Sequence, residues 1–188
     1  DIQYDDDSCH KNSYVYEIAK VIDANTLELT ANAKISDTTS YSIGRQSYSK
    51  FRVANCEYFL VDTRGSRDMH DVNQRDKKGI SMLGKQQRDW LLQSMRESDA
   101  DFFFLTSTVP FMIPHSGAGG FEAAGNKEEA WTGFLSEREE LINEWDKLGK
   151  KLFVLTGDLH NSFAIKITDN VWEFCCGPHN SVNHVPKN

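Results

Sequence analysis

Between residues 57 and 156 the sequence alternates between segments typical of strands and segments typical of helices. Apolar, strand-like segments occupy 57–61, 102–109 and 152–156, and helical periodicity occupies the two intervals between them. This order favours parallel pairing, because a parallel neighbour needs a long crossover connection that usually contains a helix. We therefore predict an α/β fold with a parallel or mixed sheet and packed helices. The unbroken apolar run of 102–109 predicts a strand buried on both sides.

Two segments have the periodicity of an amphipathic helix. Ser81 is a candidate N-cap for a helix that runs to about residue 98. Asn126, followed by Glu129, resembles a capping box that opens a second helix. The expected buried positions are Leu83, Trp90, Leu91 and Met95 in the first helix and Trp131, Phe134, Leu135, Leu141, Ile142, Trp145 and Leu148 in the second.

Hairpin-like patterns lie on both sides of this region. Residues 13–22 and 26–31 are strand-like, and the Asp, Ala and Asn between them suit a tight turn. Residues 163–167 and 171–175 form a similar pair near the other end. We expect these hairpins to lie at sheet edges.

Length and composition exclude several classes of protein. The 188 residues allow one domain of ordinary size or part of a larger one. We expect an N-terminal arm and hairpin over 1–47 and the larger part over 48–188. The net charge of −7 argues against a protein that coats nucleic acid, since such binding rests on Lys and Arg. No apolar run approaches the roughly 20 residues needed to cross a bilayer, and the cysteine spacing fits neither a disulfide framework nor a zinc ribbon.

Polar side chains follow the predicted strands at their carboxyl ends, where open α/β sheets place their functional sites. The clusters are Asp62-Thr63-Arg64 with Arg67, Thr108 with His115, Gly157-Asp158-Leu159-His160-Asn161-Ser162, and Gly177-Pro178-His179-Asn180-Ser181. We expect these clusters to converge at one edge of the sheet.

The segment after the strand at 152–156 carries the most chemical information. Asp158 and His160 are two residues apart, and Gly157 permits a tight turn that points both into one crevice. A carboxylate and an imidazole together make half of a site for a catalytic divalent or trivalent metal ion. The alternative is that Asp158 caps the following turn and His160 is a hydrogen-bonded surface residue. Arg64 also has two possible roles, either as a salt-bridge partner or as a bidentate phosphate clamp.

Four motifs in a fixed order carry more information than the spacing of single residues. They are Tyr58-Phe59-Leu60-Val61-Asp62-Thr63-Arg64; Met82-Leu83-Gly84-Lys85-Gln86-Gln87 with Trp90-Leu91; Val154-Leu155-Thr156-Gly157-Asp158-Leu159-His160-Asn161-Ser162; and Glu173-Phe174 with Gly177-Pro178 and Asn180-Ser181. Together they resemble the PhoD-like alkaline phosphatase family, which belongs to the calcineurin-like metallophosphoesterases. The resemblance extends from about residue 48 to residue 184. The ordered set is specific, whereas each motif alone is weak.

The resemblance implies a four-layer sandwich of mixed β-sheets flanked by helices, with this chain as its C-terminal part. It implies hydrolysis of phosphate monoesters or diesters, in which metal ions activate a water that attacks phosphorus. Calcium and iron are the expected ions, with zinc, manganese and magnesium as alternatives, and the expected location is periplasmic or extracellular. The residues matched to roles are Asp158 and His160 as metal ligands and catalytic residues, Asn161 as a catalytic neighbour, and Arg64 and Asp62 as substrate-binding residues.

Two departures from the superfamily pattern matter. Many relatives have a His two residues before a Pro where this sequence has Thr108, and an oxygen donor there favours harder ions such as calcium or ferric iron. The signatures Asp-x-His, Gly-Asp-x-x-Asp and Gly-Asn-His-Asp/Glu should precede Asp62, and none is present. We therefore expect a missing N-terminal part of the same protein to supply the remaining ligands. The rival hypothesis is a catalytically inert binding or structural module that retains the fold. A metal-free nucleotide-binding protein is weaker, because the Gly-rich segment 117–120 follows no strand.

Overall fold

The structure is a computed structural model, in which the chain divides into two compact units, Asp1–Arg45 and Gln46–Asn188. The predicted division between residues 47 and 48 stays a prediction. Among the residues that the structure describes, no helix is long and apolar enough to cross a membrane. The described residues are 12, 16–38, 46–68, 78–113 and 130–178.

The first unit contains an antiparallel hairpin. Strand β1 (Ile18–Asp23) pairs with β2 (Thr26–Leu29). The Asp23 carboxylate closes the turn, because its Oδ1 accepts a hydrogen bond from the Asn25 amide at 2.8 Å. The predicted hairpin is therefore confirmed, with shorter strands than the sequence suggests.

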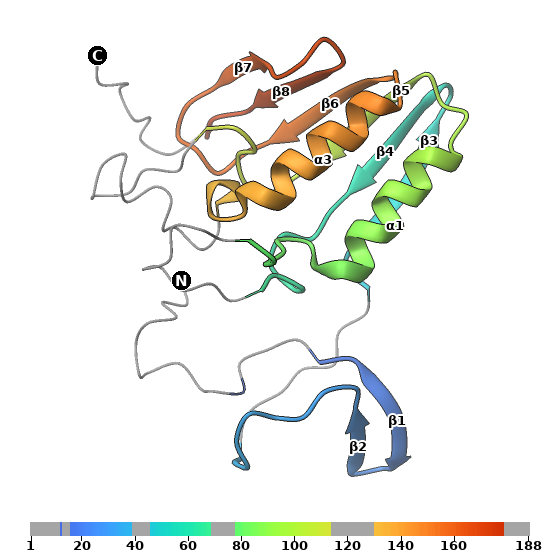
Figure 1. Cartoon of the computed structure of the whole chain (residues 1–188), viewed down its shortest axis with the longest axis vertical. Coiled ribbons are helices and arrows are strands. Elements are labelled where there is room, and N and C mark those ends of the chain that lie inside the picture. Colours follow the sequence, from blue (N-terminus) through green and yellow to red (C-terminus); the bar gives the residue numbers. More distant parts are fainter. Residues whose placement is uncertain (1–11, 13–15, 39–45, 69–77, 114–129, 179–188) are drawn as a thin grey trace. The chain divides into compact units, whose positions relative to one another are not determined.

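The second unit is built on a six-stranded mixed sheet in the order β3-β4-β5-β6-β8-β7 (Figure 1). Strands β4, β5, β6 and β8 run parallel, whereas the edge strands β3 and β7 pair antiparallel with their neighbours. This confirms the predicted mixed α/β sheet. The strands are β3 (Ser49–Val53), β4 (Cys56–Leu60), β5 (Phe102–Thr106), β6 (Lys151–Thr156), β7 (Phe163–Lys166) and β8 (Val171–Cys175).

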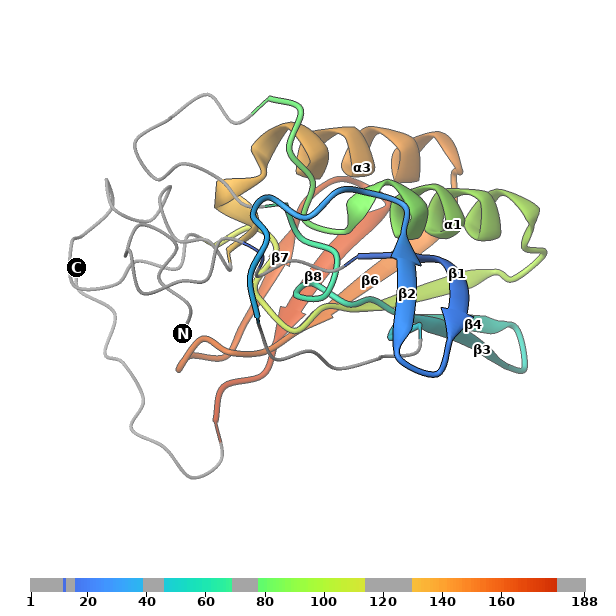
Figure 2. The same ribbon diagram turned by 90° about the horizontal axis from the view of Figure 1, so that it is seen from below.

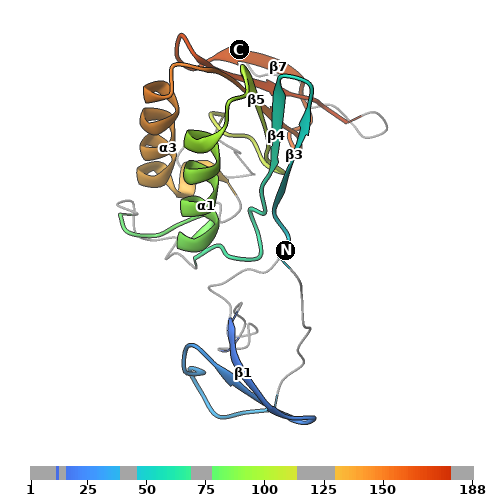
Figure 3. The same ribbon diagram turned by 90° about the vertical axis from the view of Figure 1, so that its right-hand side faces the viewer.

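Helices α1 (Gly84–Glu97) and α3 (Leu135–Lys147) lie side by side on one face of this sheet (Figures 2 and 3). α1 connects β4 to β5, and α3 connects β5 to β6, so each parallel neighbour is reached through the helical layer. Every second strand residue faces the helices and is buried there. The core formed in this way includes Phe59, Phe103, Leu105, Leu152, Val154 and Val171 from the sheet and Leu91, Met95, Leu141 and Trp145 from the helices.

The first helix follows its predicted pattern except at its start. α1 begins at Gly84 with Leu83 as its N-cap, so the predicted cap at Ser81 was wrong. The hydroxyl oxygen of Ser81 still accepts a hydrogen bond from the Gly84 amide at 2.8 Å. Leu91 and Met95 are buried, as predicted. Trp90 is only half-buried, and its ring lies against the rings of two other aromatic residues, Tyr48 and Phe59.

The second helix begins later than the sequence predicts. α3 starts at Leu135, and a 3-10 turn over Trp131–Gly133 precedes it. Trp131 and Phe134 are buried but reach the core from this turn, whereas Leu135 is 45% exposed. The single continuous stripe was therefore wrong at its start, because two buried aromatic residues need not share a helix with the residues that follow. The predicted cap residues, Asn126 and Glu129, lie outside the described residues.

The face of the sheet opposite the helices carries a row of aromatic side chains. Phe51 stacks on Tyr58 with ring centroids 4.8 Å apart, and Tyr58 stacks on Phe104 at 4.7 Å. The row continues from Phe104 to Phe153 at 5.2 Å. Phe174, which follows Phe153 in the row, is 41% exposed. This face is therefore apolar and accessible in the chain.

The open face corrects one prediction about β5. The segment 102–109 was expected to be a strand buried on both sides, but β5 ends at Thr106, and Phe102 on the open face is 38% exposed. The apolar run reflects a sheet with two apolar faces, of which helices cover one. The second unit thus has one helical layer and one sheet, which correspond to two of the four layers that the resemblance implies.

Candidate active site

The carboxyl ends of the parallel strands lie in register at one edge of the sheet. Leu60, Thr106 and Leu155 occupy neighbouring positions in β4, β5 and β6. Just beyond them, the Val61 amide donates to the Thr106 carbonyl at 3.2 Å, and the Ser107 amide donates to the Leu155 carbonyl at 2.9 Å. The loops that follow β4, β5 and β6 therefore start from the same edge, as the topology requires (Figure 1).

Asp62 organises the turn that follows β4. Its Oδ1 accepts hydrogen bonds from the amides of Arg64 at 2.8 Å and Gly65 at 2.9 Å, and its Oδ2 accepts one from the Ser47 hydroxyl. Partial burial raises the pKa of Asp62, but these hydrogen bonds and the nearby Arg64 charge outweigh burial, so the pKa is lowered overall. The carboxylate is thus held in its charged form and directed at the turn. Its predicted contact with substrate stays a prediction.

Gln87 in α1 holds the main chain of Asp62. Its Oε1 accepts a hydrogen bond from the Asp62 amide at 2.8 Å, and its Nε2 donates to the Asp62 carbonyl at 2.9 Å and to the Leu83 carbonyl at 3.0 Å. The side chain is almost completely buried. A buried amide with these partners is fully engaged, and it fixes the point at which the chain leaves β4.

A pair of threonines connects the loops that follow β4 and β5. The Thr63 and Thr108 hydroxyls share a hydrogen bond, and Thr63 is buried whereas Thr108 is exposed. By the resemblance, we expect Thr108 to stand where many relatives in the superfamily have a His. Its hydroxyl therefore joins two of the loops that the sequence analysis predicted to converge.

Asp158 has an unusual backbone conformation directly after β6. Its φ is +70°, and the Leu159 amide donates to the Gly157 carbonyl at 2.9 Å, which places Asp158 at the centre of a γ-turn with positive φ. Such turns are rare and strained, although Asp tolerates positive φ better than most residues. Asp158 is exposed, whereas His160 and Asn161 are half-buried. The tight turn was predicted, but the sequence suggested that Gly157 would carry it.

The loop after β8 packs against the loop that contains Asp158. The Gly177 amide donates to the Ser162 hydroxyl oxygen at 2.9 Å. A Cβ at position 177 would lie 3.1 Å from the Asn161 carbonyl carbon, so a larger residue there would require the neighbouring chain to shift by a few tenths of an ångström. The Cys175 thiol donates to the Gly157 carbonyl at 3.6 Å, and burial raises its pKa. These contacts fix both ends of the segment 157–162.

A buried carboxylate stabilises the loop that follows β5. Glu173 in β8 has no exposed surface, and its Oε1 accepts hydrogen bonds from the Phe111 amide and the Thr156 hydroxyl, both at 2.8 Å. Its Oε2 accepts a hydrogen bond from the Met112 amide at 2.9 Å. Glu173 therefore connects β8, the end of β6 and the chain that continues from Thr108.

Sequence reasoning did not assign roles to Gln87, Glu173 or Thr63, although a signal was present for two of them. Gln87 is four residues from both Leu83 and Leu91, so the helical period places its amide on the buried face. Glu173 alternates with apolar residues of β8 that face the helices. A polar residue at a buried position is a candidate for holding neighbouring main-chain groups.

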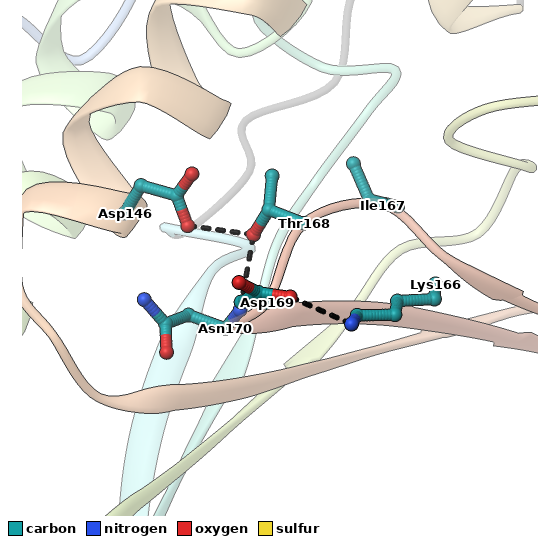
Figure 4. A pocket seen from close by; sticks show the side chains of 6 residues that line it. All are labelled: Asp146, Lys166, Ile167, Thr168, Asp169 and Asn170. Carbon is teal, nitrogen blue, oxygen red and sulfur yellow. Dashed lines mark hydrogen bonds and ion pairs between the residues drawn. The ribbon is translucent and has the colours of Figure 1, made fainter.

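A shallow polar depression lies at the other end of the sheet. Its walls come from the end of α3 and the β7–β8 turn, and its polar groups are paired with one another (Figure 4). Thr168 donates to Asp146 at 2.6 Å, and Lys166 pairs with Asp169 at 2.6 Å. Asn170 lies beside Leu152 at the amino end of β6. The depression is therefore remote from the carboxyl edge and from Asp158.

The candidate metal ligands suit the expected ions in type but not in number. Asp158 and His160 are of the right kind for a calcium or iron site. Within the described ranges, however, no three His, Cys, Asp or Glu side chains lie together in a way that could hold an ion. His115 and His179, which the sequence analysis expected at the same edge, lie outside those ranges. The donors thus fit in type and are too few in number, and their metal-binding role stays a prediction.

Comparison with known proteins identifies the family. A family model described as PhoD-like phosphatase matches residues 34–188. Alkaline phosphatase D of Bacillus subtilis (strain 168) is 30% identical over 129 residues, which cover 63% of this chain and 22% of that protein. A solved structure described as "Structure of PhoD" is similar in fold, with a TM-score of 0.60 and 24% identity over 71% of this chain and 29% of that chain. The chain spans less than a third of either relative. Because the family model matches most of the chain, the chain belongs to the PhoD-like phosphatase family.

Proposed function

We propose that the protein containing this chain hydrolyses phosphate esters at the carboxyl edge of the sheet. The observation that carries the proposal is the segment after β6, where Asp158 has a strained backbone two residues before His160. Strained residues cluster at functional sites, where the surrounding structure maintains them. Membership of a phosphatase family supports hydrolysis as the class of reaction.

Asp158 and His160 are the proposed metal ligands, and residues beyond the described part of the chain complete the site. Bound metal ions in such a site polarise phosphoryl oxygens and lower the pKa of a bound water. The contribution of this chain is to hold a carboxylate and an imidazole on a short loop whose ends are fixed by β6 and by Gly177. We propose calcium and ferric iron as the ions, because Thr108 offers an oxygen where many relatives have nitrogen.

Arg64 is the proposed contact to the phosphate oxygens, since a guanidinium can bind two of them at once. Asp62 supports this role by holding the backbone of Arg64, because its carboxylate accepts a hydrogen bond from the Arg64 amide. Asn161 is the proposed polar neighbour of the ligands. The substrate is a phosphate monoester or diester, and the site of action is periplasmic or extracellular.

The test uses the full-length protein that contains this chain. Asp158→Asn and His160→Ala should each lower turnover of a chromogenic phosphate ester by at least about a hundredfold, as expected for lost metal ligands. The bound calcium and iron, measured by elemental analysis, should fall in the same variants. Assays with a monoester and a diester side by side identify the class of substrate.

Asp169→Asn is the matched control. Asp169 is an exposed acid at the β7–β8 turn, and it pairs with Lys166 on the surface. Its substitution should leave turnover and metal content unchanged, because an exposed ion pair contributes little. Near-normal turnover in the Asp158 or His160 variant would remove the metal role from that residue. Loss of activity in the control would indicate a general effect of the substitution.

A further inference from the structure

Gln87 is a buried polar residue whose position in α1 puts it against the edge of the sheet. Leu83 and Leu91, one turn away on either side, are buried in the core. Gln87 shares their face of the helix, although a polar amide is costly to bury without partners. Its neighbour Gln86 has the same side chain and is exposed. The burial of Gln87 therefore requires an explanation that composition does not provide.

The explanation lies in the main chain of Asp62. The ladder between β4 and β5 ends where the Val61 amide donates to the Thr106 carbonyl at 3.2 Å. Beyond it, Gln87 supplies an acceptor to the Asp62 amide at 2.8 Å and a donor to the Asp62 carbonyl at 2.9 Å. A side-chain amide offers a donor and an acceptor in one plane, so it can replace the edge of a neighbouring strand.

The anchored Asp62 then orients the residues after it. Its carboxylate accepts hydrogen bonds from the amides of Arg64 and Gly65 at 2.8 and 2.9 Å. The Gln87 amide is connected in this way, through two sets of hydrogen bonds, to the backbone of Arg64. A change at Gln87 would loosen Asp62 and, through it, the turn that carries the guanidinium.

We propose that Gln87 is a positioning residue, which fixes the Asp62-Thr63-Arg64 turn so that Arg64 meets the phosphate group. This inference rests on the proposed role of Arg64 as a phosphate contact. Gln87 itself touches neither substrate nor metal. Its effect on the reaction should therefore pass entirely through Arg64, and that dependence can be measured.

The test compares Gln87→Met with Gln86→Met in the full-length protein. Gln87→Met keeps the length and removes both hydrogen-bonding groups. It should raise KM and the inhibition constant of inorganic phosphate by about tenfold, with a smaller change in kcat, because misplaced binding groups weaken binding and orientation. Gln86→Met should match the wild type. If Gln87→Met does not fold, Gln87→Asn replaces it, since the shorter amide cannot reach both Asp62 groups.

A double-mutant cycle separates positioning from general stability. In an Arg64→Met background, the substitution of Gln87 should have no further effect on the inhibition constant of phosphate, because residues that act as a unit are not additive. Additive effects of the two substitutions would overturn the proposal. So would an unchanged inhibition constant in the Gln87 variant.

Amide hydrogen exchange tests the same proposal without the reaction. Gln87→Met should speed exchange in residues 62–65 by about tenfold or more, while exchange in β6 stays as in the wild type. Unchanged or uniformly faster exchange would overturn the proposal. If the wild-type protein hydrolyses no phosphate ester, the proposed function fails, and hydrogen exchange still decides whether Gln87 fixes the turn.

Discussion

Replacement of Glu173 by glutamine should destabilise the protein, because two buried donors and one partly buried donor depend on its carboxylate. The Phe111 amide and the Thr156 hydroxyl bind Oε1, and the Met112 amide binds Oε2. A glutamine amide has one acceptor oxygen and one donor nitrogen. In either orientation, its NH₂ group faces at least one protein donor and leaves that donor without an acceptor.

The magnitude follows from the number of groups left unsatisfied. A buried donor without a partner costs about 1–3 kcal/mol. Glu173→Gln leaves at least one main-chain or hydroxyl donor without an acceptor, so we expect a loss of about 1–3 kcal/mol in the free energy of unfolding. Glu173→Ala leaves three donors unpaired and opens a cavity. Its larger loss approaches the whole stability of a typical domain, which is about 5–15 kcal/mol.

Glu57→Gln is the matched control, because Glu57 is also buried on the helix side of the sheet. Its Oε1 pairs with Lys50 at 3.0 Å, and its Oε2 has no partner among the described residues. Glutamine keeps an acceptor for Lys50 and removes a poorly compensated charge. We therefore expect a change within about 1 kcal/mol.

Urea denaturation followed by tryptophan fluorescence provides the measurement. The Phe111 ring lies 4.9 Å from the Trp131 ring and 5.3 Å from the Trp145 ring, so release of the loop changes the environment of two reporters. The midpoint should fall markedly for Glu173→Gln and little for Glu57→Gln. Equal midpoints in the two variants would refute the reasoning, because they would show that satisfied and unsatisfied buried carboxylates contribute alike.

Three further predictions concern the carboxyl edge. Asp158→Gly should leave the thermal midpoint equal to or above that of the wild type, since glycine adopts a positive φ without strain, at a gain of about 1 kcal/mol. Ester hydrolysis should nevertheless be lost. A marked fall in the midpoint would argue against backbone strain. The pKa of Asp62 lies below its ordinary value of 3.8, so the folded state binds fewer protons than the unfolded state. Stability should therefore fall as pH drops through that region, and Asp62→Asn should flatten the dependence in acid unfolding curves. Gly65→Ala places a Cβ 2.3 Å from Asp62 Oδ2 and should displace the carboxylate from Ser47, at about 1–3 kcal/mol, measured by thermal unfolding.

The sheet was predictable from sequence because its signals are local and repeated. The apolar runs at 57–61 and 152–156 and the helix from Gly84 follow the periods of strands and helices directly. The start of α3 was not predictable in the same way. Trp131 is buried by contact with Phe111, a residue distant in sequence, and such packing leaves no helical period to recognise.

The residue types of the candidate site could be predicted from the sequence, but the residues that hold its loops in place could not. Asp158 and His160 are candidates because a carboxylate and an imidazole after a buried strand are chemically distinctive, and their role stays a prediction. The γ-turn at Asp158 could not be foreseen, since Gly157 beside it is the more usual residue for a tight turn. The partners of Gln87 and Glu173 depend on which loops come together, and only the folded chain specifies this.

The buried polar groups explain how the edge can sustain strain. Main-chain groups beyond the ends of the strands lose their ladder partners, and a buried group must find another. Gln87 serves the loop after β4, Glu173 serves the loop after β5, and Glu137 accepts hydrogen bonds from the Ser81 hydroxyl and the Met82 amide before α1. Burial raises the pKa of Glu137, which disfavours the charged form of this carboxyl group.

These supports come from the helix side or from within the sheet. A strained residue such as Asp158, at a cost of about 1–3 kcal/mol, persists only where its surroundings are over-determined. The Gly177–Ser162 and Cys176–Thr156 hydrogen bonds supply that constraint on the two sides of its loop. Weakening either constraint should therefore relax Asp158 before it unfolds the sheet, whereas loss of Glu173 should act on the sheet and the loops together.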